Sequence, residues 1–390
     1  MNPQPCALSV ILIVKDEAAM LPDCLASLRP LGAQVVVCDT GSTDDTVAIA
    51  EASGAIVTHF PWCDDFAAAR NHALRHAMGD WVLTVDADER VLPSAVPHLL
   101  KLTKLKPEHL LSLPILNDKG PEGVVTHLGT RMFPGHRGVR YEGRIHEVPV
   151  HPEFREFAPD LPPCIMHLGY RDEVYRARNK AQRNIKLLLE STLDKPGDPV
   201  TRLYLAQSLI AAEQWPDAID QARVCLHLCA AYPPDRIAIV ADQAAVHLVD
   251  AVAHTAGDAL ALIEAGQQMR QRPIAHPGFW YVVGCVQLRD AIEQRSPENA
   301  QMALSSLHRC LALKGAATFQ QDAGITSWKP LRAIVEAHTF LGQFELAEAY
   351  EALLAKVSAA GLSSPAPVCA EGFGAVSVPD RPIRMEDNAA

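Results

Sequence analysis

The sequence predicts an α/β domain with a mostly parallel sheet over residues 1–172, followed by an all-α domain over residues 173–362. Within about the first 90 residues, short apolar runs alternate with helical patterns, which is the order of β-α-β units in a parallel sheet. From about Glu173 onward the strand patterns end and Ala-rich helical periodicity takes over. Residues 363–390 are Pro-rich and irregular, so we expect a loose tail there.

The composition indicates a soluble globular protein with room for two or three domains. The chain has 390 residues, of which 48% are hydrophobic and 21% are charged. Its formal net charge is −11, from 35 basic and 46 acidic residues. This balance argues against general nucleic-acid binding, which requires a basic surface.

The cysteines and the N-terminal sequence favour a cytoplasmic protein. Ten cysteines are scattered without a CxxC pair, as expected of reduced thiols. The apolar run at residues 7–14 is too short to cross a membrane and ends at Lys15-Asp16-Glu17. We therefore expect a strand there, with neither a signal peptide nor a transmembrane segment.

Four apolar runs predict buried parallel strands, at residues 8–14, 35–38, 56–60 and 81–85. Three helical patterns separate them. The first carries an apolar stripe over residues 20–28, and the second begins at Ser42-Thr43-Asp44-Asp45, where a hydroxyl cap precedes acidic residues. The third is capped by Asp64 or Asp65 and runs through Met78.

Polar residues gather where the predicted strands end. Ligands of open parallel sheets bind beyond the carboxyl ends of the strands. The residues at these ends are Val14, Lys15 and Glu17 after the first strand, Asp39 at the second, and Asp86, Ala87, Asp88 and Glu89 after the fourth. Their convergence predicts a ligand site at this edge of the sheet.

The pair Asp86 and Asp88 is the central feature of this site. Two carboxylates directly after a buried strand can face one crevice, and oxygen ligands suit Mg²⁺ or Mn²⁺. Such a cation can bridge the phosphates of a nucleoside diphosphate and stabilise the leaving phosphate. An exposed acidic turn is the alternative.

Asp39 and Arg70 extend the predicted site toward a nucleotide. A carboxylate at Asp39 can accept the ring N–H of a uracil, although it could instead cap the following turn. Arg70 lies on the helix before the acidic motif and could reach a base or a phosphate. A surface position, or an ion pair with Asp65, is its alternative.

The helical half carries a degenerate repeat pattern. Trp280-Tyr281-Val282-Val283-Gly284 matches the W-x-x-L-G opening of a tetratricopeptide repeat, with Val in place of Leu. Its second helix would cover residues 299–313, after an insertion near residues 295–298. Related positions hold Trp215-Pro216-Asp217-Ala218 and Phe344-Glu345-Leu346-Ala347. We predict tetratricopeptide-like hairpins, with a plain helical bundle as the alternative, and place Cys225 and Cys229 at apolar helix positions.

Taken together, the N-terminal motifs resemble the family-2 glycosyltransferases of GT-A fold. The closer resemblance is to a bacterial branch in which this domain precedes tetratricopeptide-like repeats, which includes relatives of lipopolysaccharide-core glucosyltransferases and peptide S-glycosyltransferases. The motifs that carry it are residues 8–17, Asp39-Thr40-Gly41-Ser42 with residues 43–46, Asp65-Phe66 with Arg70-Asn71, and residues 81–89. A weaker resemblance continues through Arg144-Ile145-His146-Glu147 and His167-Leu168-Gly169-Tyr170.

The resemblance implies a UDP-sugar donor that carries a hexose or an N-acetylhexosamine, and an inverting reaction. It places Asp39 next to the uracil base of the donor, Asp86 near the ribose, and Asp88 among the ligands of a Mn²⁺ or Mg²⁺ ion. Such enzymes often add a late histidine to the metal shell. His167 is our candidate and His146 is its rival.

The resemblance also places Glu147 near the acceptor. An inverting transferase uses a carboxylate to take the acceptor proton, and Glu147 is our candidate base. The H-E sequence at His146 does not indicate a zinc protease, because His151 comes one place too late and Pro149 interrupts the required helix. No Glu-Asp pair marks a base downstream of the motif. A thiol acceptor would need little help from a base.

The acceptor stays open between a peptide or protein and a surface glycan. We expect the helical domain to hold it in part, or to form a homodimer. A non-enzymatic scaffold and a sugar nucleotidyltransferase are the alternative functions. The sequence lacks GxxxxGK[ST], GxGxxG and GxSxG motifs, which argues against P-loop ATPases, Rossmann dehydrogenases and α/β-hydrolases.

Overall fold

The computed structural model describes residues 7–118, 124–168, 174–255, 274–313 and 323–363. They divide into two compact units, one ending at Val174 and the other beginning at Tyr175. We call them the N-terminal unit and the helical unit. The predicted boundary between residues 172 and 173 lies outside the described residues. So does the predicted tail, residues 363–390, except for Ser363, which is the last residue of a helix.

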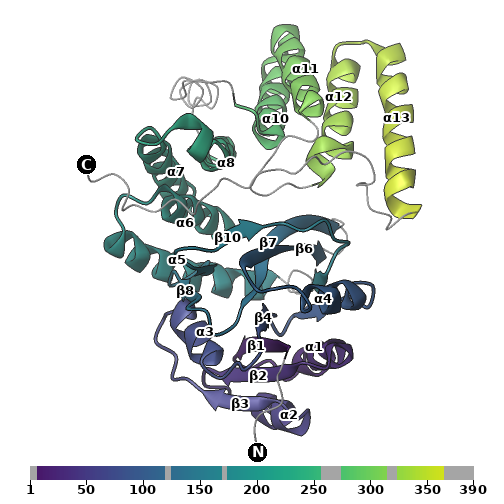
Figure 1. Cartoon of the computed structure of the whole chain (residues 1–390). Helices are drawn as coiled ribbons and strands as arrows, with labels where there is room; N and C mark the ends of the chain where they lie inside the picture. The colour runs from purple at the N-terminus through teal and green to yellow at the C-terminus, as the bar shows by residue number, and fades with distance from the viewer. Residues whose placement is uncertain (1–6, 119–123, 169–173, 256–273, 314–322, 364–390) are drawn as a thin grey trace, which may run out of the picture. The chain divides into compact units, whose positions relative to one another are not determined.

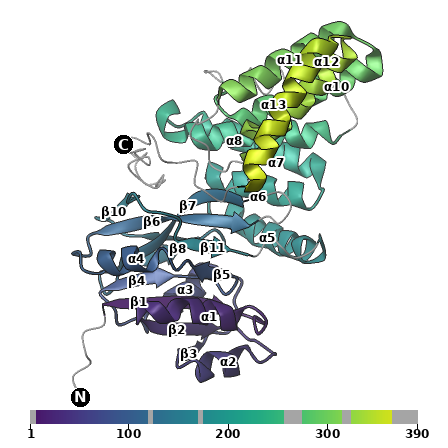
Figure 2. The same ribbon diagram turned by 90° about the vertical axis from the view of Figure 1, so that its right-hand side faces the viewer.

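The N-terminal unit contains the four predicted parallel strands. They lie in the order β3-β2-β1-β4, with all neighbours parallel (Figures 1 and 2). Their bounds are β1 Leu8–Val14, β2 Gln34–Asp39, β3 Ile56–His59 and β4 Trp81–Thr84. The predicted α/β fold class is confirmed, as is the parallel arrangement of these four strands.

Beyond β4 the sheet becomes mixed. Strand β7 is antiparallel to both β4 and β6, β11 is parallel to β6, and β5 is antiparallel to β11. Strand β10 also pairs with β6, while β8 and β9 form a separate antiparallel pair. The bounds are β5 Glu89–Val91, β6 His109–Asp118, β7 Val124–Pro134, β8 Arg140–Glu142, β9 Val148–Val150, β10 Arg155–Phe157 and β11 Ile165–His167.

Helices cover both faces of the parallel strands. The helices of this unit are α1 Leu21–Leu28, α2 Thr46–Ala52, α3 Phe66–Leu74 and α4 Val96–Leu102, with a 3₁₀ turn at Arg29–Leu31. Alternate residues of β1 serve two cores: Val10 and Leu12 pack with α1, whereas Ile11 packs with α3. A strand that is buried on both faces needs a continuous apolar run, and β1 has one.

Helix α2 begins at Thr46, so the predicted start at Ser42 is wrong. The Ser42 hydroxyl accepts a hydrogen bond from the backbone N–H of Asp16 instead of capping a helix. The side chain of Asp44 accepts from the N–H groups of Ala18 and Thr46. Polar side chains that suit a helix cap here build a loop.

Helix α3 begins as predicted and ends earlier than predicted. Asp65 caps it, because its Oδ1 accepts from the N–H of Ala68 at 2.8 Å. The helix ends at Leu74 rather than Met78. The N–H groups of Met78 and Gly79 donate to the hydroxyl of Ser9 on β1, at 3.0 and 2.8 Å, so this segment leaves the helix to join the sheet.

The helical unit consists of successive helices (Figure 1), and short turns join α5 to α6, α6 to α7, α7 to α8, α10 to α11 and α12 to α13. Hairpins form from α6 with α7, from α10 with α11 and from α12 with α13. The bounds are α5 Val174–Asp194, α6 Pro199–Ala211, α7 Trp215–Cys229, α8 Pro234–Ala253, α10 Pro277–Gln294, α11 Pro297–Ala312, α12 Trp328–Phe340 and α13 Phe344–Ser363. The predicted all-α half is confirmed.

The hairpin predicted from the tryptophan motif is present. Helix α11 begins at Pro297, so the supposed insertion is only the two-residue turn between α10 and α11. Gly284 lies where these helices approach closely, because a Cβ there would meet Leu307 Cγ at 2.7 Å. Cys225 and Cys229 are both buried on α7, as predicted for apolar helix positions. None of the helices in the described ranges combines the length and the apolar character that crossing a membrane requires.

Candidate active site

The strand register brings the predicted polar residues to one edge of the sheet. Val14 at the end of β1 is paired with Asp39 at the end of β2, and β4 runs parallel on the other side of β1. The backbone N–H and the hydroxyl of Thr40 both donate to the carbonyl of Val14, at 2.9 and 3.0 Å. The acidic motif begins two residues beyond the end of β4.

The loop after β1 is tied to the loop after β2. The N–H of Thr43 donates to Asp16 Oδ1 at 2.7 Å, and the N–H of Glu17 donates to the Thr46 hydroxyl at 2.7 Å. Asp16 adopts the left-handed backbone conformation, at a φ of 54°. Lys15 stays exposed beside these contacts. The two loops thus form one hydrogen-bonded rim.

Asp39 is 5% exposed and organises the turn that follows it. Its two carboxylate oxygens accept from the N–H groups of Gly41 and Ser42, at 3.1 and 3.0 Å. His59 Nδ1 lies 3.4 Å from Oδ2. Burial would raise the pKa of Asp39, but the hydrogen bonds from Ser42, Gly41 and His59 outweigh it and hold the pKa below its usual value. The capping alternative is therefore realised, and the contact with uracil stays a prediction.

Arg70 lies on α3 with its side chain only 8% exposed and contacts two carboxylates. Its Nη2 donates to Asp86 Oδ1 at 2.8 Å, and its Nε donates to Glu147 Oε1 at 2.5 Å. Neither alternative for Arg70 holds, because it is buried and Asp65 caps α3. Within the described residues, Nη1 of Arg70 has no hydrogen-bond partner although it is buried. This N–H group is available to an anionic or hydroxyl-bearing ligand.

A second arginine, Arg131 on β7, completes the charge compensation. Its Nη1 lies 3.4 Å from Asp86 Oδ2, and its Nη2 donates to Glu89 Oε1 at 2.6 Å. Burial would raise the pKa of Asp86, but Arg70 and Arg131 outweigh it and hold the pKa well below its usual value. Glu89 is 1% exposed, and burial raises its pKa to about 7 although Arg131 opposes the shift. Its Oε2 accepts from the N–H of Asp86.

Arg90 fixes the backbone of the acidic motif. Its Nη1 donates to the carbonyls of Ala87 and Glu89, at 2.9 and 2.8 Å, and its Nη2 donates to the carbonyl of Met20 at 2.9 Å. Ala87, which lies between Asp86 and Asp88 in the sequence, is buried. Sequence reasoning missed Arg90 and Arg131, whose roles follow only from the three-dimensional pairing.

His167 is the candidate histidine whose ring lies at the acidic motif. Strand β11 places it opposite Glu89, and its Nε2 is 3.3 Å from Asp88 Oδ2. Burial would lower the pKa of His167, but the hydrogen bond with Asp88 and the nearby acidic charges raise it above its usual value. The rival, His146, lies in the turn before Glu147 at a φ of 54°.

A metal would depend on the nucleotide for part of its coordination. Over the described ranges, no three or more His, Cys, Asp or Glu side chains are grouped to hold an ion. Asp88 and His167 can supply two ligands. Mg²⁺ is commonly held by one or two carboxylates, with substrate phosphates and water completing its octahedron. The residues fit an ion that binds together with a diphosphate.

The sequence of this unit matches a known family model. Residues 9–145 match the model of glycosyl transferase family 2. We refer to these matching residues, 9–145, as the family 2 domain. The acidic motif, Asp39 and Arg70 all lie inside this family 2 domain, whereas Glu147 and His167 follow it.

Two curated relatives are similar to about half of this chain. A TPR repeat-containing protein of Synechococcus elongatus is 34% identical over 223 residues, covering 53% of this chain and 55% of the relative. The SPbeta prophage-derived glycosyltransferase SunS of Bacillus subtilis is 26% identical over 217 residues, covering 54% and 50%. The chain thus spans about half the length of these relatives.

Solved structures also align with part of the chain. Glucosyl-3-phosphoglycerate synthase from Mycobacterium tuberculosis, crystallised with Mn²⁺, uridine diphosphate and glucosyl-3-phosphoglycerate, is 27% identical. The alignment covers 29% of this chain and 43% of that chain, at a TM-score of 0.24.

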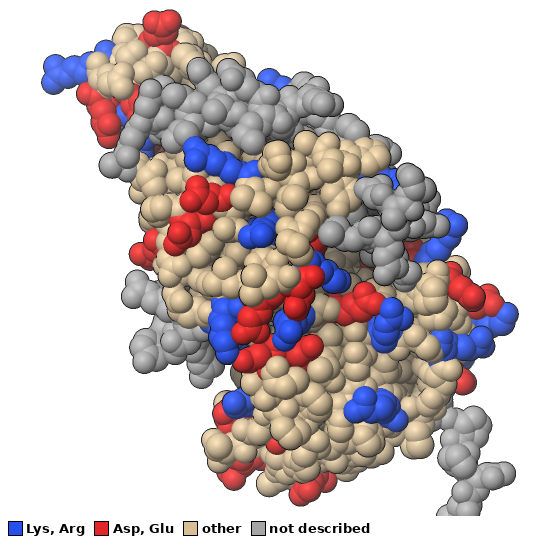
Figure 3. Space-filling model, turned by 90° about the vertical axis from the view of Figure 1, so that its left-hand side faces the viewer, with Lys and Arg blue, Asp and Glu red and all other residues tan. Residues whose placement is uncertain are grey.

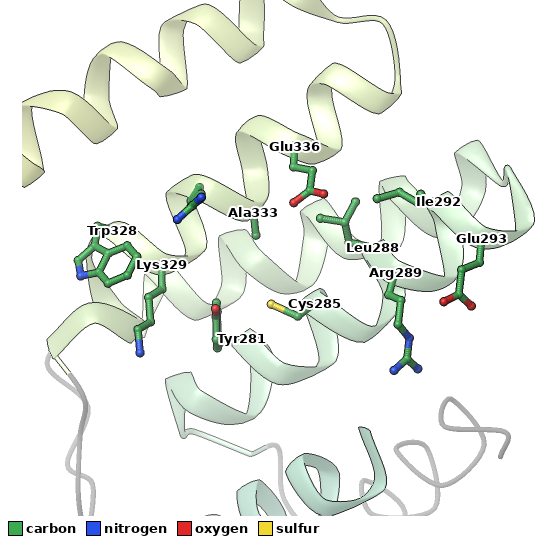
Figure 4. A pocket seen from close by; sticks show the side chains of 11 residues that line it. Tyr281, Cys285, Leu288, Arg289, Ile292, Glu293, Trp328, Lys329, Ala333 and Glu336 are labelled. Atoms are coloured by element: carbon green, nitrogen blue, oxygen red, sulfur yellow. The ribbon is translucent and has the colours of Figure 1, made fainter. Parts of the chain in front are cut away.

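Outside the family 2 domain, the helical unit has a hollow of its own between α10 and α12 (Figure 4). Its volume is about 570 Å³, and its lining includes Tyr281 and Cys285 from α10 and Trp328, Lys329 and Arg332 from α12. Aromatic and cationic side chains therefore border one concave surface.

On the face of the molecule in Figure 3, Lys and Arg side chains are interspersed with Asp and Glu side chains.

Proposed function

We propose that this chain is a metal-dependent glycosyltransferase that moves a hexose or an N-acetylhexosamine from a UDP-sugar to an acceptor. One observation carries the proposal. The acidic motif lies at the carboxyl edge of the parallel strands of a family 2 domain, with Asp88 Oδ2 only 3.3 Å from His167 Nε2. Such an edge is where nucleotides bind to α/β sheets.

The donor is expected to lie along this edge. Val14, Lys15 and Glu17 belong to the hydrogen-bonded rim, which would border the nucleoside. Asp39 has lone pairs beyond the two that its own turn uses, so it can still accept the ring N–H of uracil. Asp86 and the backbone at Ala87 would lie near the ribose.

Arg70 is suited to bind the donor as well as to hold the site together. Its Nη1 is buried and makes no hydrogen bond to any described residue. A buried donor without a partner is costly, and a phosphate or ribose oxygen would satisfy it. We expect binding of the donor to restore this missing hydrogen bond.

Asp88 and His167 would hold Mn²⁺ or Mg²⁺ together with the diphosphate. The ion would stabilise negative charge on the leaving UDP. Because the chain offers two ligands and the nucleotide would complete the coordination, metal and UDP should each strengthen the binding of the other. A metal affinity that does not change when UDP is added would contradict this arrangement.

Glu147 is the proposed base of an inverting reaction. It would take the acceptor proton as the acceptor attacks C1 of the sugar. The Nε of Arg70 holds its carboxylate at 2.5 Å, so Glu147 is fixed next to the residue that also holds Asp86. The position of the base is thereby linked to the donor site.

The acceptor is a peptide or protein segment, or a surface glycan. The hollow between α10 and α12 supports a contribution of the helical unit, because Trp328 and Tyr281 offer rings that an acceptor could pack against. Its lining also carries charges of both signs, from Arg289, Lys329 and Arg332 and from Glu293 and Glu336. Replacing Trp328 with Ala should raise the acceptor KM and leave UDP affinity unchanged. An unchanged acceptor KM would remove this hollow from the acceptor site.

The test of donor binding is calorimetric titration of UDP with and without Mn²⁺, combined with an assay of UDP-sugar hydrolysis. We expect Mn²⁺ to tighten UDP binding and Asp88→Ala to abolish the tightening. Asp80→Ala, which alters an exposed carboxylate outside the motif, is the matched control. Absence of UDP binding in both conditions would favour the non-enzymatic scaffold. Release of pyrophosphate from UTP and a sugar phosphate would favour the nucleotidyltransferase.

The base is tested by Glu147→Gln, which keeps the shape of the side chain. We expect lower turnover with unchanged UDP affinity. A loss of UDP affinity would assign Glu147 to the donor site. Unchanged turnover would fit an acceptor that ionises without a base, such as a thiol.

A further inference from the structure

Behind His167 lies a chain of side chains from three adjacent strands. Asn117 on β6 is paired with His167 on β11, and β6 also pairs with β7, which carries His127. Asn117 Oδ1 is 2.9 Å from His167 Nδ1, and Asn117 Nδ2 is 2.7 Å from His127 Nδ1. One amide therefore contacts both rings.

The chemistry of an amide sets the direction of these hydrogen bonds. Its carbonyl oxygen only accepts, so His167 Nδ1 must carry a proton. Its NH₂ group only donates, so His127 Nδ1 must be unprotonated. Without metal, Nε2 of His167 donates to Asp88 Oδ2 at 3.3 Å. An imidazole that keeps its proton on Nδ1 can release the proton on Nε2 and present the Nε2 lone pair to a metal ion.

We propose that Asn117 is a positioning residue that keeps His167 protonated at Nδ1, so that Nε2 is available to the metal ion shared with Asp88. This inference rests on the proposed function. If the amide were reversed, its NH₂ group would donate to Nδ1 of His167. The neutral ring would then carry its proton on Nε2, and Nε2 could not bind a metal ion. The contact with His127 favours the observed orientation of the amide when Nδ1 of His127 is the acceptor for Nδ2.

Neither an aliphatic nor an acidic side chain reproduces these contacts fully. Leucine has the bulk of Asn but would leave Nδ1 of His167 without its acceptor. Aspartate would still accept from His167 Nδ1, although it could not donate to His127. The pair of variants Asn117→Leu and Asn117→Asp therefore separates loss of the acceptor from mere alteration of the residue.

The experiment measures Mn²⁺ binding in the presence of saturating UDP, by electron paramagnetic resonance of free Mn²⁺, for the full-length protein and both variants. We expect Asn117→Leu to weaken Mn²⁺ binding by about 10- to 100-fold, the usual effect of removing a hydrogen-bond partner of a ligating histidine. Asn117→Asp should stay close to wild type, and UDP binding without metal should be unchanged in both. Wild-type Mn²⁺ affinity in a folded Asn117→Leu protein would overturn the proposal.

A second measurement does not require metal binding. Nitrogen-15 NMR of the histidine rings in the metal-free protein reports which nitrogen carries the proton. At a pH high enough for the ring to be neutral, we expect His167 to carry its proton on Nδ1 in the wild type and in Asn117→Asp, and to lose this preference in Asn117→Leu. An unprotonated Nδ1 in the wild type would overturn the positioning role. If the wild type shows the protonated Nδ1 but binds neither Mn²⁺ nor UDP, the proposed function fails while the placement of the proton by Asn117 stands.

Discussion

Asp86 lies between two arginines, Arg70 on α3 and Arg131 on β7. Arg131 compensates both Asp86 and Glu89, whose side chains lie close enough to contact the same guanidinium. Arg131→Met should lower the free energy of unfolding by about 1–3 kcal/mol, because the buried Glu89 loses the donor that now binds its Oε1. Chemical denaturation measures this change.

Arg140→Met is the matched control for Arg131. Arg140 pairs with Glu142 at 2.5 Å, but both side chains are exposed, at 55% and 41%. An exposed pair contributes only about 0–1 kcal/mol, so this variant should unfold almost as the wild type does. Equal losses in the two variants would contradict the role given to burial.

The lowered pKa of Asp39 predicts how the stability of the fold depends on pH. Its pKa is lower in the folded protein than in an unfolded chain, so its charge stabilises the fold at neutral pH, and this contribution is lost as the pH falls through the folded value. Asp39→Asn should be less stable at pH 7 by about 1 kcal/mol, the scale of one hydrogen bond. The difference should shrink below about pH 4, in unfolding curves recorded from pH 7 to pH 3. A constant difference would contradict the argument.

The acidic residues that sequence reasoning identified without the family resemblance, Asp39, Asp86 and Asp88, all lie at or just beyond the ends of parallel strands. Because each β-α-β unit returns the chain to the same edge, Asp39, Asp86 and Asp88 could be brought together from their order alone. Arg131 and Asn117 escaped prediction because they lie on β7 and β6. Their partners depend on the antiparallel pairing of β7 with β4 and β6 and on the parallel pairing of β6 with β11, which no local pattern specifies.

At the scale of elements, the strands were easier to predict than the helix starts. An apolar run buried on both faces leaves few alternatives, and β1 Leu8–Val14 matches its prediction residue for residue. The segment Ser42-Thr43-Asp44-Asp45 was misassigned because the same short polar side chains serve helix caps and loops. Here contacts with the loop after β1 decide the outcome, and those contacts are distant in sequence.

The α10–α11 hairpin depends on Gly284. A Cβ at this position would lie 2.7 Å from Leu307 Cγ and 3.4 Å from the carbonyl oxygen of Ala303. Gly284→Ala should therefore destabilise the helical unit by about 1–3 kcal/mol through overpacking, as measured by urea denaturation. Adding Leu307→Ala should relieve part of the clash, so the two changes should be less than additive. Strict additivity would contradict a direct contact.

At the scale of the whole molecule, the two units have separate cores. Clusters built on β1 serve the N-terminal unit, and a cluster that includes Leu288, Leu307 and Ile334 serves the helical unit. The division into α/β and all-α halves was predictable because hydrophobic periodicity changes between them. The hollow between α10 and α12 could not be predicted from the sequence. Its lining side chains come from two helices that are separated along the chain by a third helix, α11.

Separate cores predict a local response to the donor. UDP with Mn²⁺ should slow amide hydrogen exchange around the carboxyl ends of β1, β2 and β4, because bound ligand stabilises only the unit that holds it. At a UDP concentration about 100 times its Kd, the stabilisation should approach 2.7 kcal/mol. Exchange in α10 to α13 should not change. Asp88→Ala should remove the part of the protection that depends on Mn²⁺. Protection of equal size in α10 to α13 would mean that the two units respond to the donor as one cooperative body.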